Sequence, residues 1–477
     1  MPVEIPRQRG KEERFPRGME REKQQPDIRK RKSRRAVSVS RIIALAFLSI
    51  ILLGAALLNL PAASRDGRSA GPVVSLFTAT SATCVTGLVL TDTWTQWSGF
   101  GQAVILLMIQ VGGLGFMSAA SLAYFSLRRK VSIQQQMLIA ESSGVQNMGD
   151  VLAHQKRLLV RAFAVEGAGA VLLTIRFSME YPFLQAAKLG VFHAVSAFCN
   201  AGFDILGFRT PGASMMEYQR DPAICLILSV LVILGGLGFL VWDELLRERR
   251  PSRWSVYTKL VMITSGVLLA GGTGAFCLLE WTNPHTLGPL SVPEKLLAAF
   301  FQSMTLRTAG FAALDQGMLS PAGKAVSIFL MLIGGSSGST AGGLKTVTFV
   351  VLMMFLWNRI RGRRTVGIFK RTVSDEQVMN AIQIFMLMLL LSFTAATVIC
   401  ATSSMDFTDS LYEAMSAIGT VGLSAAGTNR ISLPAQFLIM LLMYFGRVGV
   451  LTISMGFLRS KPTGEKYRYA YTDLLIG

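Results

Sequence analysis

Four short segments of the sequence combine small residues, hydroxyl side chains and a glycine in the same order. They read ATSATCVTGL, AVSAFCNAGF, FQSMTLRTAGF and AMSAIGTVGL, and their glycines are Gly87, Gly202, Gly310 and Gly422. Glycine adopts left-handed backbone angles at little cost, so such segments can point successive carbonyl oxygens in one direction. Rings of backbone carbonyls replace the hydration shell of a cation in selective pores. The chemistry that this pattern predicts is therefore cation coordination.

A further stretch, GGSSGSTAGGLKT at 334–346, has the composition of a loop that cradles phosphates, and we call it the Gly-Ser loop. The phosphate motif needs Lys directly after its last Gly, whereas Leu344 stands between Gly343 and Lys345. Apolar runs flank the stretch on both sides, and no soluble strand–helix unit surrounds it. The nucleotide interpretation is therefore weak. Irregular backbone at membrane depth survives only where protein or a cavity covers it, so the pattern favours a broken membrane helix.

Arg447 is the one charge inside the apolar run IMLLMYFGRVGVLTISMGF. A charge at the bilayer centre costs about 2.5–3.5 kcal/mol or more, which makes such a residue a functional candidate. It aligns with Gly113, Gly236 and Gly335 of the other repeats, which directs it toward a shared axis. Pairing with a buried carboxylate is the weaker alternative, because no Asp or Glu lies within ten residues on that segment.

Other side chains with chemical potential are sparse. Asp92, Asp204 and Asp315 follow three of the four glycines and could form an acidic outer mouth that concentrates cations, although ordinary surface solvation explains each one equally well. The 5 cysteines and 3 histidines are scattered without metal-ligand spacing. No catalytic cluster appears, so we expect no enzyme.

The composition identifies the elements that must position these residues. Of 477 residues, 51% are hydrophobic and only 16% are charged, against about 25% charged in soluble proteins. Apolar stretches of membrane-crossing length recur, so we expect an all-α integral membrane protein. The formal charge of +19 arises from Lys and Arg clusters between those stretches, which favours cytoplasmic loops over nucleic-acid binding. The same rule predicts that both termini are cytoplasmic.

The chain reads as a fourfold repeat of a long apolar segment, a short segment and a second long apolar segment. A second glycine cluster closes each copy, at 112–115, 235–238, 334–338 and 446–449. The eight long segments are 41–60, 99–126, 157–179, 222–246, 256–281, 321–358, 376–402 and 433–458. We expect a basic disordered tail over 1–40, repeats over 41–130, 155–250, 255–360 and 375–460, and a cytoplasmic C-terminal tail over 461–477.

The fourth short segment contains Thr420-Val421-Gly422, the filter triplet of potassium channels. With the four glycine segments and the Gly-Ser loop, the chain resembles the Trk/Ktr/HKT superfamily of potassium transporters over about residues 40–477, and most closely its Ktr membrane subunits (KtrB type). The resemblance implies four M1–pore loop–M2 repeats with fourfold pseudosymmetry around one pore, and eight transmembrane helices. It further implies potassium uptake across the plasma membrane; a sodium-conducting or Trk-type cation transporter is the alternative.

The resemblance also implies the site residues. The ion-binding residues of the filter would be Cys84, Val85, Thr86, Gly87, Cys199, Asn200, Ala201, Gly202, Arg307, Thr308, Ala309, Gly310, Gly419, Thr420, Val421 and Gly422. The gate would be formed by Gly334, Gly335, Ser336, Ser337, Gly338, Ser339, Thr340, Ala341, Gly342, Gly343, Lys345 and Arg447, with a hinge that has no gating role as the alternative. Gly87 favours potassium, since plant relatives that carry sodium have serine there.

Partners and cofactors follow from the same resemblance. It implies a homodimer in the lipid bilayer, regulated by a cytoplasmic ring of RCK subunits (KtrA type) that binds ATP, ADP or NAD(H). We expect no cofactor in this chain and no metal other than the transported K⁺ at the filter carbonyls. Cys84 and Cys199 would contribute only carbonyls, so we expect their side chains to matter little.

Overall fold

The computed structural model describes residues 39–115, 151–363, 365–369 and 371–449, which lie in one unit of the chain, Ser38–Gly477. The expected C-terminal tail lies outside the described residues, and so does the basic tail apart from residues 39 and 40. The ends of the first and fourth repeats, at 116–130 and 450–460, also lie outside them.

Four long apolar helices form the periphery. They are α1 (Val39–Leu58), α7 (Val151–Phe177), α11 (Val256–Glu280) and α15 (Asp375–Thr402). Each is long and apolar enough to cross a membrane. Large apolar side chains project outward from them, with Leu53, Val267 and Leu390 each more than 60% exposed. Such extended apolar surface is suited to lipid and would favour aggregation in water.

Each long helix packs against the short helix that follows it in sequence. The short helices are α2 (Pro72–Cys84), α8 (Phe183–Phe198), α12 (Val292–Thr305) and α16 (Phe407–Gly419). The start of α12 is fixed by a capping box between Ser291 and Glu294, and Pro72 occupies the first turn of α2. All four helices end at buried residues, so the chain emerges from each of them inside the protein.

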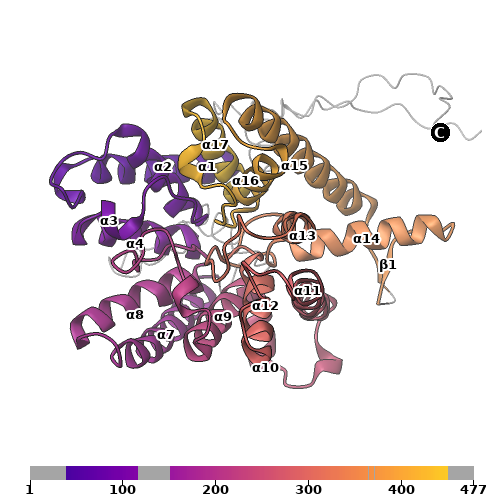
Figure 1. Ribbon diagram of the computed structural model, residues 1–477. Coiled ribbons are helices and arrows are strands. Elements are labelled where there is room, and N and C mark those ends of the chain that lie inside the picture. Colours follow the sequence, from indigo (N-terminus) through magenta and orange to yellow (C-terminus); the bar gives the residue numbers. More distant parts are fainter. Residues whose placement is uncertain (1–38, 116–150, 364, 370, 450–477) are drawn as a thin grey trace, which may run out of the picture. The chain divides into compact units, whose positions relative to one another are not determined.

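A third helix completes each group and closes a cycle. These helices are α4 (Gly99–Leu114), α9 (Pro222–Leu237), α13 (Pro321–Leu332) and α17 (Leu433–Val448). Each packs against the short helix of the next group: α4 on α8, α9 on α12, α13 on α16, and α17 back on α2. Figure 1 shows the four groups succeeding one another around a common centre. Each short helix thereby packs against the long helix of its own group and the third helix of the preceding group.

Three of these helices end at a glycine with the same left-handed φ. The angles are +86° at Gly115, +87° at Gly238 and +95° at Gly449. After Gly238 the chain continues as α10 (Phe239–Arg247), bent by 96° from α9. The apolar segment expected over 222–246 is therefore not one unbroken helix, because an L-residue helix cannot pass through such a φ. The apolar pattern continues across the bend and hides it.

The remaining elements connect these groups. In the third group α13 is followed by the Gly-Ser loop and then by α14 (Thr346–Ile360), and a small hairpin pairs β1 (Gly367–Ile368) with β2 (Arg371–Thr372). The prediction of a helical membrane fold is confirmed. Within the described residues four helices meet the criteria for a span, or five if α9 and α10 count as one. Eight crossings therefore stay a prediction, since α4, α13, α14 and α17 are shorter apolar helices.

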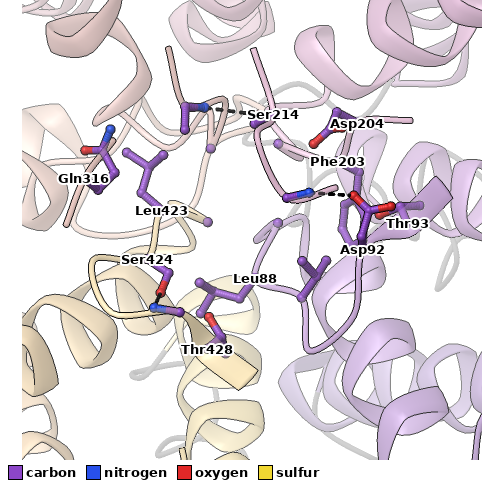
Figure 2. A pocket seen from close by; sticks show the side chains of 18 of the residues that line it. Leu88, Asp92, Thr93, Phe203, Asp204, Ser214, Gln316, Leu423, Ser424 and Thr428 are labelled. Atoms are coloured by element: carbon purple, nitrogen blue, oxygen red, sulfur yellow. Dashed lines mark hydrogen bonds between the residues drawn. The ribbon is translucent and has the colours of Figure 1, made fainter. Parts of the chain in front are cut away.

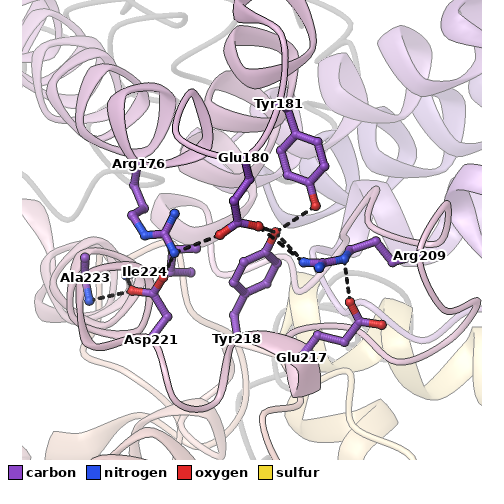
Figure 3. Close-up of polar contacts among 9 residues, drawn as sticks. All are labelled: Arg176, Glu180, Tyr181, Arg209, Glu217, Tyr218, Asp221, Ala223 and Ile224. Carbon is purple, nitrogen blue, oxygen red and sulfur yellow. Dashed lines mark hydrogen bonds and ion pairs between the residues drawn. The ribbon is translucent and has the colours of Figure 1, made fainter.

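A polar network ties the end of α7 to the start of α9 (Figure 3). Arg176 lies 2.8 Å from Glu180 and 2.5 Å from Asp221. Asp221 also caps α9 by accepting hydrogen bonds from the first backbone N–H groups of that helix. Arg209 joins the network through Glu180, at 3.4 Å, and also pairs with Glu217, at 2.8 Å. The network fixes the spacing of the two helices between which α8 is held.

Candidate functional site

The chain turns sharply where each short helix ends. We call the four turns Cys84–Gly87, Cys199–Gly202, Arg307–Gly310 and Gly419–Gly422 the glycine loops. Their second residues are all left-handed: φ is +56° at Val85, +58° at Asn200, +69° at Thr308 and +52° at Thr420. For β-branched residues this conformation is a genuine outlier, which costs of order 1–3 kcal/mol and persists only where the surrounding structure enforces it. A left-handed residue at four equivalent positions, β-branched in three of them, makes these loops the candidate functional site.

The glycines that end these loops also have left-handed φ angles and form a closed ring. The φ values are +94° at Gly87, +69° at Gly202, +82° at Gly310 and +92° at Gly422. A Cβ on Gly87 would lie 2.5 Å from Ala201 O, one on Gly202 2.8 Å from Ala309 O, and one on Gly310 2.6 Å from Val421 O. A Cβ on Gly422 would collide with Thr86 O, which closes the ring. Each glycine therefore abuts the backbone of the next group around one central point.

Hydroxyl side chains hold the loops from behind. Ser81 O accepts from Thr86 N at 2.8 Å and Ser81 Oγ from Gly87 N at 3.0 Å; Ser416 makes the equivalent bonds to Val421 N and Gly422 N. The loop N–H groups therefore point away from the centre. Among the described residues, none donates a hydrogen bond to the carbonyl oxygens of 85–87, 200–202, 308–310 or 420–422.

The third group departs from the seryl pattern seen in the sequence. Ser303 aligns with the other serines, but its hydroxyl donates to Leu269 O on α11 at 2.9 Å. Thr305 takes over the support: its hydroxyl donates to Phe311 O at 2.7 Å, and its carbonyl accepts from Ala309 N at 2.9 Å. Thr305 thus makes the bond that Ser196 makes in the second group, where the seryl hydroxyl donates to Phe203 O at 2.7 Å.

On one side the glycine loops border a pocket of about 390 Å³ (Figure 2). The pocket is lined by all four loop glycines and by Asp92, Asp204 and Asp315. Burial raises the pKa of Asp204 to about 6; the backbone N–H of Leu206 opposes this shift and the nearby Asp92 adds to it. The structure thus brings together the three carboxylates expected at the outer mouth. Clustered carboxylates in a concave site attract cations.

Beyond the loops, away from the pocket, lies the Gly-Ser loop. Thr340 donates to Phe198 O at 3.0 Å, and a Cβ on Gly342 would collide with Thr420 Oγ1. Phe198 ends α8 just before the second glycine loop, and Thr420 is the second residue of the fourth. The pocket, in contrast, is lined by the glycines that end the loops. The glycine loops therefore lie between the pocket and the Gly-Ser loop.

Arg447 lies against the Gly-Ser loop. Its guanidinium donates to Thr340 O, to Gly112 O and, at 2.9 Å, to Gly113 O. In the part of the chain that the structure describes, no carboxylate lies within ion-pair distance of it. Lys345 lies on the same loop and donates to Ala341 O at 2.6 Å. Two half-buried cationic side chains thus donate hydrogen bonds to backbone carbonyls on this side of the glycine loops.

The second glycine clusters serve close packing. A Cβ on Gly112, Gly235 or Gly446 would collide with the carbonyl oxygen of Thr83, Phe198 or Ile418, the last residue before a glycine loop. The third helices can therefore approach the loops only where they carry glycine. This explains the second glycine cluster in the first, second and fourth repeats, whereas in the third repeat a Cβ on Gly334 would collide with Gly342 O inside the Gly-Ser loop.

A buried polar group that sequence reasoning missed lies behind the second glycine loop. Glu166 on α7 is 4% exposed and accepts hydrogen bonds from Gln110 on α4 at 2.9 and 3.0 Å. The thiol of Cys199 lies 3.8 Å from Glu166, and a Cβ on Gly113 would collide with that thiol. The Cys199 side chain thus contacts two helices. An acidic residue inside the apolar run 157–179 was the available signal.

These features define a class: an α-helical multi-pass membrane protein in which four short helices end at strained glycine loops around one centre. Residues 30–469 match the family model described as "TrkH: Cation transport protein", and the chain belongs to that family. It is 36% identical to the potassium/sodium uptake protein NtpJ of Enterococcus hirae, with coverage of 94% of this chain and 100% of the relative. It is 35% identical to the Ktr system potassium uptake protein B of Bacillus subtilis, with coverage of 89% and 94%.

Similarity to a solved structure extends to the fold. The potassium transporter TrkH of Vibrio parahaemolyticus superposes with a TM-score of 0.68 at 17% identity, covering 89% of this chain and 86% of that one. Proteins of this family are cation transporters and not enzymes, as the sequence predicts.

Proposed function

We propose that the protein mediates potassium uptake across the plasma membrane through a pore whose selectivity filter is the ring of glycine loops. The observation that carries the proposal is the closed ring of four glycines whose neighbouring carbonyls accept no hydrogen bond from the described residues. Carbonyl oxygens left free at membrane depth cost several kcal/mol each unless something replaces water. A partly dehydrated K⁺ at the centre of the ring would do so.

The pathway would run from the acidic pocket, through the loops, to the Gly-Ser loop. The pocket would gather cations at the outer mouth, and the Gly-Ser loop, backed by Arg447 and Lys345, would act as the gate. Its position across the path and the two positive charges support this role. Fourfold pseudosymmetry and eight crossings would follow from the cycle of helix contacts.

Relatives support the ion and the partner. The Bacillus subtilis and Vibrio alginolyticus relatives are named Ktr system potassium uptake protein B. A system name of this kind agrees with the expected regulatory ring of RCK subunits. We further propose a homodimer in the bacterial cell membrane, with both termini in the cytoplasm. Nucleotide would bind to that ring and not to this chain.

Sodium transport is the second candidate, favoured by the name potassium/sodium uptake protein of the Enterococcus hirae relative. Flux into proteoliposomes separates the two. We expect uptake of Rb⁺ that external K⁺ inhibits at far lower concentration than Na⁺. Equal inhibition by Na⁺ and K⁺ would favour the second candidate, and absence of any cation flux from folded protein would refute both.

A further inference from the structure

The segment between α9 and α11 runs across the axis of α9. The 96° bend at Gly238 directs α10 away from α9, and η4 (Pro251–Arg253) then leads into α11. If α9 spans the bilayer, α10 lies close to the membrane plane. Helices in that position have one face in the lipid and one at the headgroups.

This segment is amphipathic and basic. Val241 and Trp242 are buried, and the Trp242 ring packs on Phe198 at 5.7 Å, next to the second glycine loop. Leu246 is 64% exposed. Four arginines, Arg247, Arg249, Arg250 and Arg253, are all exposed. Within the described residues the ion pair of Arg253 with Glu248, at 3.8 Å, is the only one that involves them.

The local carboxylates are engaged elsewhere. Glu244 accepts hydrogen bonds from Ser255 Oγ at 2.6 Å and from Thr258 Oγ1, at the start of α11. Asp243 pairs with Arg161 on α7. The arginines of the segment therefore present a net positive surface beside an exposed leucine and the half-buried Trp254, the combination found at membrane interfaces.

Both ends of the segment hold the Gly-Ser loop. Phe239 N donates to Gly338 O at 3.1 Å, and Ser336 Oγ donates to Leu237 O. From the other end, Tyr257 OH donates to Ser337 O at 2.8 Å. The tip of the loop, 336–338, is thus clasped between the end of α9 and the start of α11. A force on the segment would act on the loop through these bonds.

We propose that residues 239–256 bind the headgroups of anionic phospholipids and thereby hold the Gly-Ser loop in place. Arginine forks bind phosphate oxygens in charge-assisted pairs, and polybasic segments gain about 1 kcal/mol per residue at an anionic surface, equal to about fivefold in affinity. The lipid is favoured over a soluble partner because exposed Leu246 and the Trp254 ring accompany the arginines. The consequence for flux rests on the proposed gating role of the loop; the binding itself does not.

Binding is tested directly with the full-length protein in liposomes that contain phosphatidylglycerol with a photoreactive headgroup. Crosslinks mapped by peptide mass spectrometry should fall in 239–256, and the triple variant Arg247→Gln/Arg249→Gln/Arg250→Gln should lower their yield by about 100-fold at limiting lipid. The control Arg359→Gln/Arg361→Gln/Arg363→Gln removes the same charge from exposed positions at the end of α14, so it should leave these crosslinks intact. Equal crosslinking of wild type and the triple variant would overturn the proposal.

Flux measurements then separate the lipid effect from the gate. In wild-type protein, raising the phosphatidylglycerol fraction against phosphatidylcholine should change Rb⁺ flux severalfold, and the triple variant should lose that dependence. If crosslinks fall in 239–256 but the lipid composition does not affect flux, the lipid site stands. The proposed effect of the bound lipid on the Gly-Ser loop is then refuted. If the triple variant loses regulation by a cytoplasmic partner while its lipid crosslinks are unchanged, the proposal of a lipid site is overturned and the segment binds a protein partner instead.

Discussion

Val85, Thr308 and Thr420 are β-branched residues in a left-handed backbone conformation, and no local sequence rule favours it. The conformation is enforced from outside: Ser81 and Ser416 bind the loop N–H groups, and neighbouring groups leave no space for another path. Such strain is stored where it orients reacting or binding groups. In the proposed filter, this strain would turn the carbonyls of each loop toward the centre of the ring.

At Gly310 we predict that serine lowers K⁺ selectivity. A side chain there would lie 2.6 Å from Val421 O and would need a φ of +82°, at a backbone cost of about 1–2 kcal/mol. Inhibition of Rb⁺ uptake by Na⁺ should become stronger by on the order of tenfold. The control is Gly274→Ser on α11, where nothing lies within 4 Å of the added Cβ. Unchanged Na⁺ exclusion in Gly310→Ser would count against the filter.

Asp204 should give uptake a dependence on external pH. Its raised pKa of about 6 means that the carboxylate is charged above that pH and becomes neutral as the pH falls through it. The half-saturating concentration of Rb⁺ should therefore rise severalfold between pH 7.5 and pH 5. The Asp204→Asn variant should bind Rb⁺ weakly at both pH values, so its half-saturating concentration should not change between them. The control Asp66→Asn, at an exposed position outside the pocket, should keep the pH dependence. If the pH dependence of Rb⁺ binding survives in Asp204→Asn, a different titrating group is responsible for it.

For Arg447 the expected effect is a gain of flux. Alanine removes the three hydrogen bonds to Thr340 O, Gly112 O and Gly113 O and a positive charge beside the pathway. Rb⁺ flux of Arg447→Ala should exceed that of wild type, while Arg447→Lys, which keeps the charge, should lie between them. Lower flux from a folded alanine variant would show that Arg447 supports conduction.

At the scale of elements, the Gly-Ser loop is held more firmly than its composition suggests. Ser336 N donates to Gly236 O at 3.0 Å and Thr340 N to Gly235 O at 3.2 Å, so α9 of the second group carries the loop of the third. The loop can therefore occlude a path without forming part of a helix. Its release would require the end of α9, or the clasp around its tip, to move.

Deletion of 336–341 should raise Rb⁺ flux markedly and make it independent of the cytoplasmic partner. It also removes the hydrogen bonds to α9, so we expect a modest fall in the melting temperature. A hinge without gating function predicts the opposite sign, since shortening it would misalign α13 and α14. The control deletes the four exposed residues 66–69 in the loop before α2, away from both the pocket and the Gly-Ser loop. Flux below wild type in the first deletion alone would refute the gate.

The elements also show where sequence patterns reach their limit. The glycines of the four loops could be predicted because the same order of residues recurs at similar spacing in four copies, which has one simple cause. The bend at Gly238 could not, because residues on both sides of it are apolar and periodicity reports burial, not direction. The contact between Glu166 and Cys199 was missed for a related reason: it joins α7 to the second glycine loop, and only packing brings the two residues together.

At the scale of the whole molecule, the cycle of helix contacts turns four modest units into one site. No glycine loop could form a ring alone, and each third helix packs on the short helix of the next group. Because all four groups belong to one chain, each group can differ in sequence from the other three. Arg447, Thr305 and the Gly-Ser loop each occur in one copy, and each lies next to the loops that the repeat builds.

The most direct test of the filter is the location of the ion itself. Crystals of the full-length protein grown in Rb⁺ should show an anomalous peak inside the ring, bounded by carbonyl oxygens of 85–87, 200–202, 308–310 and 420–422. Replacement of Rb⁺ by Na⁺ should remove the bound ion from the ring, and Gly310→Ser should weaken the peak. A peak elsewhere, with no ion inside the ring in protein that transports Rb⁺, would contradict the account.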